Sequence, residues 1–170
     1  MSKLETGFPP IADEHAKILI LGSMPSVQSL KQQHYYAHPR NAFWSIMSAL
    51  CNRDNACDYQ QRCLYLIENN IAVWDVLKSC QRQGSLDNNI DSSSIITNDF
   101  NAFFKHHPKI KHLFFNGGKA QQVYNQSVLA TLDERFISLP QTRLPSTSPA
   151  YAAMSFRQKL LSWQQAILAV

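Results

Sequence analysis

The chain has 170 residues, of which 45% are hydrophobic and 16% charged, the composition of an ordinary globular protein with one buried core. No apolar run approaches the roughly 20 residues that a membrane span requires, and the N-terminal segment MSKLETGFPPIADEH lacks the apolar stretch of a secretory signal, so we expect a cytoplasmic protein without a membrane partner. The formal net charge of +4 at pH 7 favours polyanionic partners only mildly.

The predicted secondary structure alternates between short strands and helices. Four continuous apolar runs are typical of strands buried on both faces: Ile18–Leu21, Ile71–Trp74, Leu113–Phe115 and Phe136–Leu139. Helical patterns occupy residues 41–50, 57–69, 98–106, 118–127 and the segment from 149 onward. This order predicts an α/β fold, a three-layer α/β/α sandwich with a mostly parallel four-stranded central sheet, formed by residues 1–170 as a single domain. In such a fold the site lies beyond the carboxyl ends of the strands.

The first predicted strand is followed by a long segment without helical or strand periodicity, Ser23–Arg40. Irregular segments of this length inside a compact domain are usually functional. Its start, Gly22–Ser26 (GSMPS), permits a sharp turn whose backbone amides converge on an anion. The chain has neither a Walker A lysine pattern nor G-x-G-x-x-G, which argues against a nucleotide cofactor. A second polar tract, residues 87–99, is predicted to be a flexible surface loop.

The four cysteines are spaced unlike a C-x2-C zinc site or a ferredoxin cluster, so we expect no metal and no iron–sulfur cluster. We interpret them as reduced, small hydrophobic side chains in helices. Basic residues gather in two places, the opening loop at Lys31–Arg40 and the segment Lys105–His112. The second group fits either a phosphate-facing edge or a solvated surface.

Two stretches of the opening segment resemble a known family motif. Gly22–Ser26, followed by AHPRNAFW at residues 37–44, resembles the first motif of the uracil-DNA glycosylase superfamily, particularly its mismatch-specific and hypoxanthine (deoxyinosine) branches. Later stretches resemble other motifs of the family in the same order. They are Trp74–Val76, Gly84–Asp87, Asn116–Ala120 and Leu144–Pro149. The resemblance covers about residues 15–165.

The resemblance implies a monofunctional DNA glycosylase of base excision repair, which hydrolyses the N-glycosidic bond of a flipped, deaminated base without a cofactor and acts on DNA as a monomer. Hypoxanthine is the expected base, with uracil or xanthine as alternatives. The loop at residues 144–148 lacks the histidine that stabilises the base oxygen in classical uracil enzymes, which favours hypoxanthine. Two other functions stay open: a non-catalytic nucleic-acid-binding module of the same fold, and a hydrolase of free nucleosides.

Three polar residues are candidate catalytic groups. The Asn41 amide can pair with the N–H and keto oxygen that deamination creates, although Asn is also a good helix N-cap. Asp75 can contact the base edge or stabilise positive charge on the sugar, with helix capping as its structural alternative. Asn116 adds a second amide at a strand end, where a turn cap is equally expected. Met24 stands where other branches carry a polar residue that holds the attacking water, and since a thioether cannot activate water, Asn41 and Asp75 are the candidates for that role.

Five residues are candidates for binding the base. Phe43 is expected either to stack on it, which contributes roughly 1–3 kcal/mol, or to pack in the core. The turn formed by Ser23, Met24 and Pro25 brings backbone N–H groups close to the departing base. His38 can protonate a purine nitrogen, with a structural hydrogen bond as the alternative.

A further group of residues is expected to contact DNA outside the base, mainly at its phosphates. They are Lys119, Arg143, Ser146, Thr147 and Ser148. Leu144 or Tyr151 is expected to enter the base stack that the flipped nucleotide leaves. For Tyr151, packing on the apolar face of the last helix is the alternative.

Overall fold

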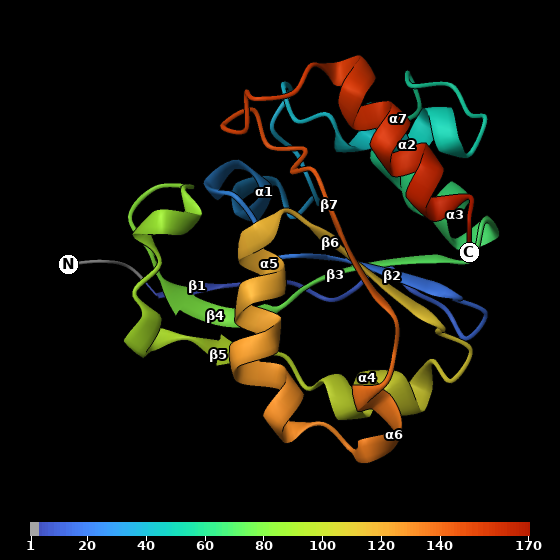
Figure 1. Ribbon diagram of the computed structural model, residues 1–170. Coiled ribbons are helices and arrows are strands. Elements are labelled where there is room, and N and C mark those ends of the chain that lie inside the picture. Colours follow the sequence, from blue (N-terminus) through green and yellow to red (C-terminus); the bar gives the residue numbers. More distant parts are fainter. Residues whose placement is uncertain (1–3) are drawn as a thin grey trace.

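The fold is built on a parallel sheet whose strands all end at the same edge. The computed structural model describes residues 4–170. Its larger sheet has four parallel strands in the order β3-β2-β6-β7 (Figure 1). They are β2 (Ile18–Gly22), β3 (Ile71–Asp75), β6 (His112–Asn116) and β7 (Gln141–Leu144). Gly22 lies opposite Asp75, and Asn116 lies opposite Leu144, so the four carboxyl ends meet at one edge.

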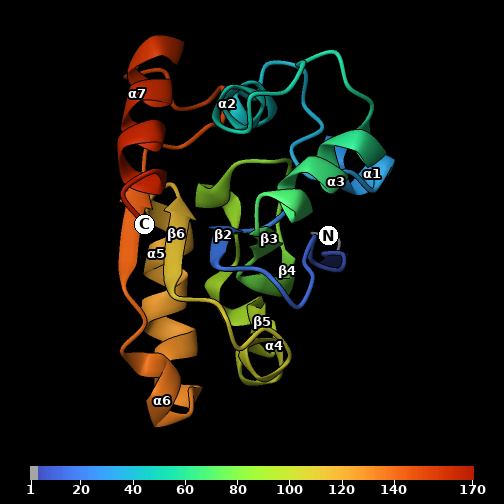
Figure 2. The ribbon, with the colours of Figure 1, turned by 90° about the vertical axis from the view of Figure 1, so that its right-hand side faces the viewer.

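Helices cover both faces of this sheet. Along β2, Ile18 and Ile20 belong to one core, whereas Leu19 and Leu21 belong to the other. The first core is closed by α2 (Phe43–Leu50), α3 (Tyr59–Glu68) and α7 (Phe156–Ile167), which lie on the same side in Figures 1 and 2. The second core is closed by α4 (Phe100–His106), α5 (Gly118–Val123) and α6 (Glu134–Ile137). The predicted α/β/α sandwich is confirmed, and burial of both faces explains the apolar runs of β2, β3 and β6.

The predicted helices are present, with shifted ends. Residues 41–50, 57–69 and 98–106 form α2, α3 and α4, and residues 118–127 form α5 with a π-helical turn at Tyr124–Val128. α7 begins only at Phe156, because Ser155 and Gln158 form a capping box there. Farther along α7, Trp163 is fully buried and its Nε1 donates to the Pro145 carbonyl at 2.9 Å. α7 therefore anchors the loop that follows β7.

The fourth strand is not where the sequence predicted it. Phe136–Leu139 overlaps α6, and the strand is β7, with the sequence QTRL. β7 is an edge strand that pairs only with β6, and Arg143 on it is exposed. An edge strand that is buried on one face does not need a continuous apolar run, so the pattern used for the central strands does not find it.

Several short elements were not predicted. α1 (Val27–Gln32) lies inside the segment that was expected to be irregular. A three-stranded antiparallel sheet is formed by β1 (Leu4–Thr6), β4 (Leu77–Gln81) and β5 (Ile96–Thr97). The polar tract 87–99 is more than a loop, because it contains β5 and two 3-10 turns. None of the helices formed by residues 4–170 has the length and apolar character that a membrane span requires.

Candidate active site

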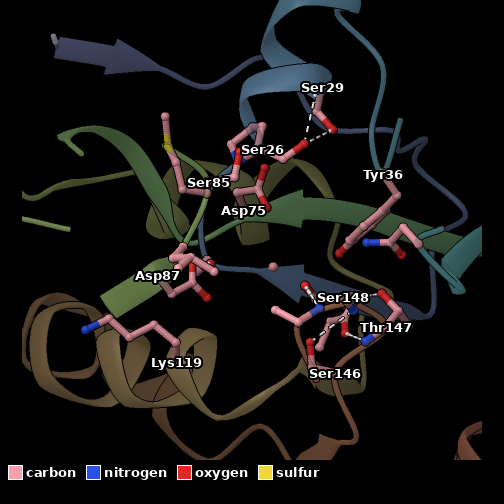
Figure 3. A pocket seen from close by; sticks show the side chains of 18 of the residues that line it. Ser26, Ser29, Tyr36, Asp75, Ser85, Asp87, Lys119, Ser146, Thr147 and Ser148 are labelled. Carbon is pink, nitrogen blue, oxygen red and sulfur yellow. Dashed lines mark hydrogen bonds between the residues drawn. The ribbon is translucent and has the colours of Figure 1, made fainter. Parts of the chain in front are cut away.

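A pocket of about 360 Å³ opens at the carboxyl edge of the parallel sheet, within the usual size range of small-molecule sites (Figure 3). The residues that line it include Gly22, Ser23, Met24, Pro25, Tyr36, Asn41, Asp75, Ser85, Asp87, Asn116, Lys119, Ser146, Thr147, Ser148 and Tyr151. The parallel topology predicts a site at this edge. Of the candidate residues named from the sequence, the structure brings most together here. The ones that do not line the pocket are Phe43, His38, Arg143 and Leu144.

Asn41 lines the pocket with one end of its amide already engaged. Its Oδ1 accepts a hydrogen bond from the Phe43 N–H at 3.0 Å, at the start of α2. The next N–H, that of Ala42, donates to the Thr147 carbonyl at 3.0 Å. Within residues 4–170 the Asn41 Nδ2 group makes no hydrogen bond. Asn41 therefore has the capping role and still presents two N–H donors and an oxygen lone pair to a ligand.

Tyr36 lines the pocket, whereas Phe43 does not. Phe43 is fully buried, with edge-on contacts to Trp44 and Trp163, and it does not line the pocket. Tyr36 does line the pocket and stacks on Phe43, with ring centroids 3.9 Å apart. The burial of Phe43 at the start of α2 therefore corresponds to its core-packing alternative. Burial and the nearby Asp75 raise the pKa of Tyr36, so its phenol stays neutral.

Asp75 is a buried carboxyl group at the end of β3. The residue is 4% exposed, and its Oδ2 makes no hydrogen bond within residues 4–170. Burial, reinforced by Asp87 and opposed by Arg82, raises the pKa of Asp75 to about 7. Gly22 makes room for the carboxyl, because a Cβ there would clash with Asp75 Oδ1 and lie 3.1 Å from the Tyr36 hydroxyl. Below neutral pH, Asp75 is mainly protonated and can donate a hydrogen bond.

Asp75 does not cap a helix. The chain passes from β3 through Val76 directly into β4, so no helix begins beside this carboxyl. The Asp75 carbonyl accepts a hydrogen bond from Asn98 Nδ2 at 2.8 Å, and the Val76 N–H donates to the Gly22 carbonyl at 2.9 Å. These contacts fix the backbone on both sides of the carboxyl, whose own Oδ2 is buried and has no hydrogen-bond partner within residues 4–170.

Asn116 joins the end of β6 to the loop after β7. Its Nδ2 donates to Thr147 Oγ1 at 2.8 Å, and its Oδ1 accepts from the Thr147 N–H at 2.9 Å. Gly117 follows with a φ of 95°, a conformation that glycine adopts readily, and a Cβ there would lie 3.1 Å from the Ser146 Cβ. Because both ends of the amide are engaged, the contacts favour a positioning role for Asn116.

A second carboxyl group, Asp87, reaches the pocket from the connection between β4 and β5. Its Oδ1 accepts a hydrogen bond from Ser23 Oγ at 2.7 Å. Two residues earlier, Ser85 Oγ accepts from the Val27 N–H at 2.9 Å and ties this connection to α1. The sequence signal was Gly84–Asp87, which resembles a loop of the hypoxanthine branch, yet no role was assigned to Asp87 from it.

The rim of the pocket carries groups suited to a polyanion. Lys119 and Ser148 line it, and the exposed Tyr151 (39%) stands beside them. Lys159, itself buried, donates from Nζ to the Tyr151 carbonyl at 2.8 Å and supports this loop from below. Leu144 is 3% exposed and belongs to β7, so the prediction that Leu144 enters the base stack is wrong.

His38 and Arg143, which were predicted to contact the base and the DNA, also lie outside the pocket. His38 Nδ1 accepts a hydrogen bond from the Arg40 N–H at 3.1 Å, which corresponds to its structural alternative. Arg143 is exposed on β7. Its guanidinium group lies beside Gly118, with Nη1 3.6 Å from the position that a Cβ would take on that glycine. The basic segment Lys105–His112 precedes and begins β6, so it lies at the opposite edge of the sheet from the pocket.

The cysteines do not form a metal centre with other ligands. Among residues 4–170, no group of three or more His, Cys, Asp or Glu side chains is placed to hold a metal ion. All four cysteines are free thiols. Burial raises the pKa of Cys51 to about 11 and also raises that of Cys80, so these thiols stay protonated.

The fold and the pocket define an α/β protein with a cleft lined by polar side chains at the carboxyl ends of its parallel strands. The sequence model of the Uracil DNA glycosylase superfamily matches residues 9–169, and the chain belongs to this superfamily. This confirms the resemblance seen in the first motif.

Individual relatives agree with this assignment. The chain is 39% identical over 115 residues to the Hypoxanthine DNA glycosylase of Methanosarcina barkeri, covering 67% of this chain and 72% of the relative. It is 39% identical over 118 residues to the Hypoxanthine DNA glycosylase of Methanosarcina acetivorans, covering 69% and 73%. A solution NMR structure of a candidate uracil DNA glycosylase from Methanosarcina acetivorans superposes with a TM-score of 0.77 at 31% identity, over 96% of this chain and 98% of that one.

Proposed function

We propose that this protein is a monofunctional DNA glycosylase that hydrolyses the bond between hypoxanthine and deoxyribose in DNA. Both curated relatives described above are hypoxanthine DNA glycosylases. The observation that carries the proposal is the Asn41 amide, whose free Nδ2 lines the same pocket as the Tyr36 ring. An amide donor beside an aromatic surface is what a flipped keto base requires.

The pocket chemistry favours a deaminated purine over adenine. A hypoxanthine ring that stacks on Tyr36 presents an N–H next to a keto oxygen. The Asn41 Nδ2 group donates to that oxygen, and the remaining lone pair of its Oδ1 accepts the N–H. Protonated Asp75 supplies a further donor from the end of β3. Adenine has an amino donor in place of the keto oxygen, so it would face the Asn41 donors with a donor of its own.

The reaction is a hydrolysis in which the bond between sugar C1′ and the base nitrogen breaks. The bonding electron pair leaves with the base, which takes up a proton, and the oxygen of water forms the new bond to C1′. Donors aimed at the base, namely the Asn41 amide, Asp75 and the backbone N–H groups of the Ser23–Ser26 turn, stabilise the developing negative charge. Each of these residues lines the pocket.

A base-release panel tests the proposed function. Purified protein is incubated, with EDTA present, with labelled oligonucleotides that contain hypoxanthine, uracil, xanthine or normal bases, in single and double strands. We expect free hypoxanthine and an alkali-labile abasic site, with weaker or no release of the other bases. No release from any substrate would overturn the proposal. Retention of oligonucleotides with intact bases would instead indicate a binding module, and cleavage of free inosine alone a nucleoside hydrolase.

Tyr36→Ala is expected to weaken hypoxanthine release by about 10-fold or more, since stacking on an aromatic ring contributes roughly 1–3 kcal/mol per base. The loss is expected for every accepted base, because a ring face does not distinguish among them. The measurement is the single-turnover rate as a function of enzyme concentration. Tyr36→Phe is the matched control, because it keeps the ring stacked on Phe43 and removes only the hydroxyl. Equal rates for Tyr36→Ala and the wild type would contradict this prediction.

We also infer that residues 1–170 act as one unit, as a monomer in the cytoplasm. The superfamily match over residues 9–169 supports a single domain.

A further inference from the structure

Asp87 lines the pocket but has no role in the proposed recognition of the base. Figure 3 shows Asp87 and Lys119 on one side of the pocket and Tyr36 and Thr147 on the other, with Asp75 between them. Asp87 is held in place, because its Oδ1 accepts the Ser23 Oγ hydrogen bond at 2.7 Å. It is half-buried, so water can reach it.

Hydrolysis is faster when a group of the enzyme takes a proton from the attacking water. The amides of Asn41 and Asn116 cannot accept one, and no histidine lines the pocket. Among the described residues that line the pocket, the carboxyl groups are those of Asp75 and Asp87. These two side chains are therefore the candidate proton acceptors that the pocket itself supplies.

The surroundings of the two carboxyl groups differ. Asp75 is almost fully buried, and its Oδ2 has no hydrogen-bond partner within residues 4–170, which favours the protonated form. Asp87 accepts the Ser23 hydrogen bond, and Lys119 and Arg82 provide positive charge close to it. Pairs of carboxyl groups whose environments separate them in this way commonly divide acid and base roles.

Resting on the proposed function, we propose that Asp87 is the catalytic base of the reaction, which holds the attacking water and removes its proton, while Asp75 acts as a neutral donor to the base. As the bond from C1′ to the base breaks, the water oxygen bonds to C1′, and one water proton passes to the Asp87 carboxylate. The base leaves with the bonding electron pair and takes a proton from solvent. Asp87 then returns its proton to solvent, so that one water is consumed for each base released.

The charged groups around Asp87 agree with this division. Burial raises the pKa of Asp87, and the Ser23 hydrogen bond, Arg82 and Lys119 all oppose that increase. Arg82 is itself fixed, because it is buried and its Nη2 donates to Glu5 Oε2 at 2.6 Å. Asp75, the other acidic group, has a pKa of about 7, so the two carboxyls are not both charged below neutral pH.

Asp87→Asn is the decisive variant, because an Asn oxygen can still accept the Ser23 hydrogen bond while the amide cannot take a proton. We expect the single-turnover rate of hypoxanthine release to fall at least about 100-fold, the usual effect of removing a general base, with oligonucleotide affinity changed less than about threefold. Asp91→Asn is the matched control: Asp91 is exposed in the same connection and lies outside the pocket. A rate for Asp87→Asn within about threefold of an active wild type would overturn the proposal. An inactive wild type would instead refute the proposed function.

If Asp87→Asn does not fold, as judged by circular dichroism, the pH dependence of the wild-type rate decides. Asp75 acts in its protonated form, so lowering the pH favours it, whereas Asp87 acts as a carboxylate. A rate that declines toward pH 4 while the protein stays folded supports Asp87 as the base, and a rate that keeps rising overturns it.

Discussion

Asn41→Ala is expected to lower the single-turnover rate of hypoxanthine release by about 100-fold or more, the usual cost of removing a donor that stabilises charge in the transition state. The Asn41 Nδ2 group lines the pocket without a partner among residues 4–170, so the substitution removes a contact made only to substrate. The same change deletes the oxygen that accepts the Phe43 N–H, which should cost about 1 kcal/mol of stability. Single-turnover kinetics and thermal unfolding measure the two effects separately.

Asn41→Asp is the matched control for this prediction. Its carboxylate keeps an acceptor for the Phe43 N–H and removes the two donors of the amide. We expect near wild-type stability together with the same loss of activity as in Asn41→Ala. If Asn41→Asp releases hypoxanthine as fast as the wild type, Asn41 is only a helix cap.

Asp75→Asn is expected to stabilise the protein at alkaline pH relative to the wild type. The pKa of Asp75 is about 7 in the folded protein and near 3.9 in an unfolded chain, so the folded state holds the proton more tightly. This contribution to stability is complete below about pH 4 and is lost as the pH rises through 7. The loss amounts to roughly 4 kcal/mol, and the neutral Asn does not suffer it.

Urea unfolding of both proteins at pH 5 and pH 9 measures this effect. From pH 5 to pH 9, the free energy of unfolding of Asp75→Asn should rise relative to that of the wild type. Asp54→Asn, at an exposed loop position, is the control and should follow the wild type. Parallel pH profiles for the wild type and Asp75→Asn would show that folding does not raise the pKa of Asp75, contrary to its buried position.

Central strands were predictable from the sequence, and peripheral ones were not. β2, β3 and β6 are buried on both faces, so each must be apolar at successive positions. β7 and the strands of the smaller sheet have exposed residues, and their position depends on pairing with partners far away in the chain. The apolar run at Phe136–Leu139 misled the prediction because a short helix can bury Phe136 and Leu139 equally well.

The site was predictable where it follows from topology. Asp75 and Asn116 end parallel strands, and Asn41 precedes a helix that packs on the same sheet, so the fold brings all three to one edge. Tyr36 and Asp87 lie in irregular segments, where side-chain direction is set by tertiary contacts such as the Tyr36–Phe43 stack and the Ser23–Asp87 hydrogen bond. No local periodicity reports such contacts.

The double hydrogen bond between Asn116 and Thr147 has a consequence for how tightly a nucleotide is held. It immobilises the loop after β7 as the chain folds, and the Thr147 carbonyl in turn fixes the N–H that follows Asn41. The conformational entropy of this loop is therefore lost when the chain folds and not when DNA binds. The polar groups of this loop are already oriented before a base enters the pocket. Little of the binding free energy is therefore lost in reordering the enzyme.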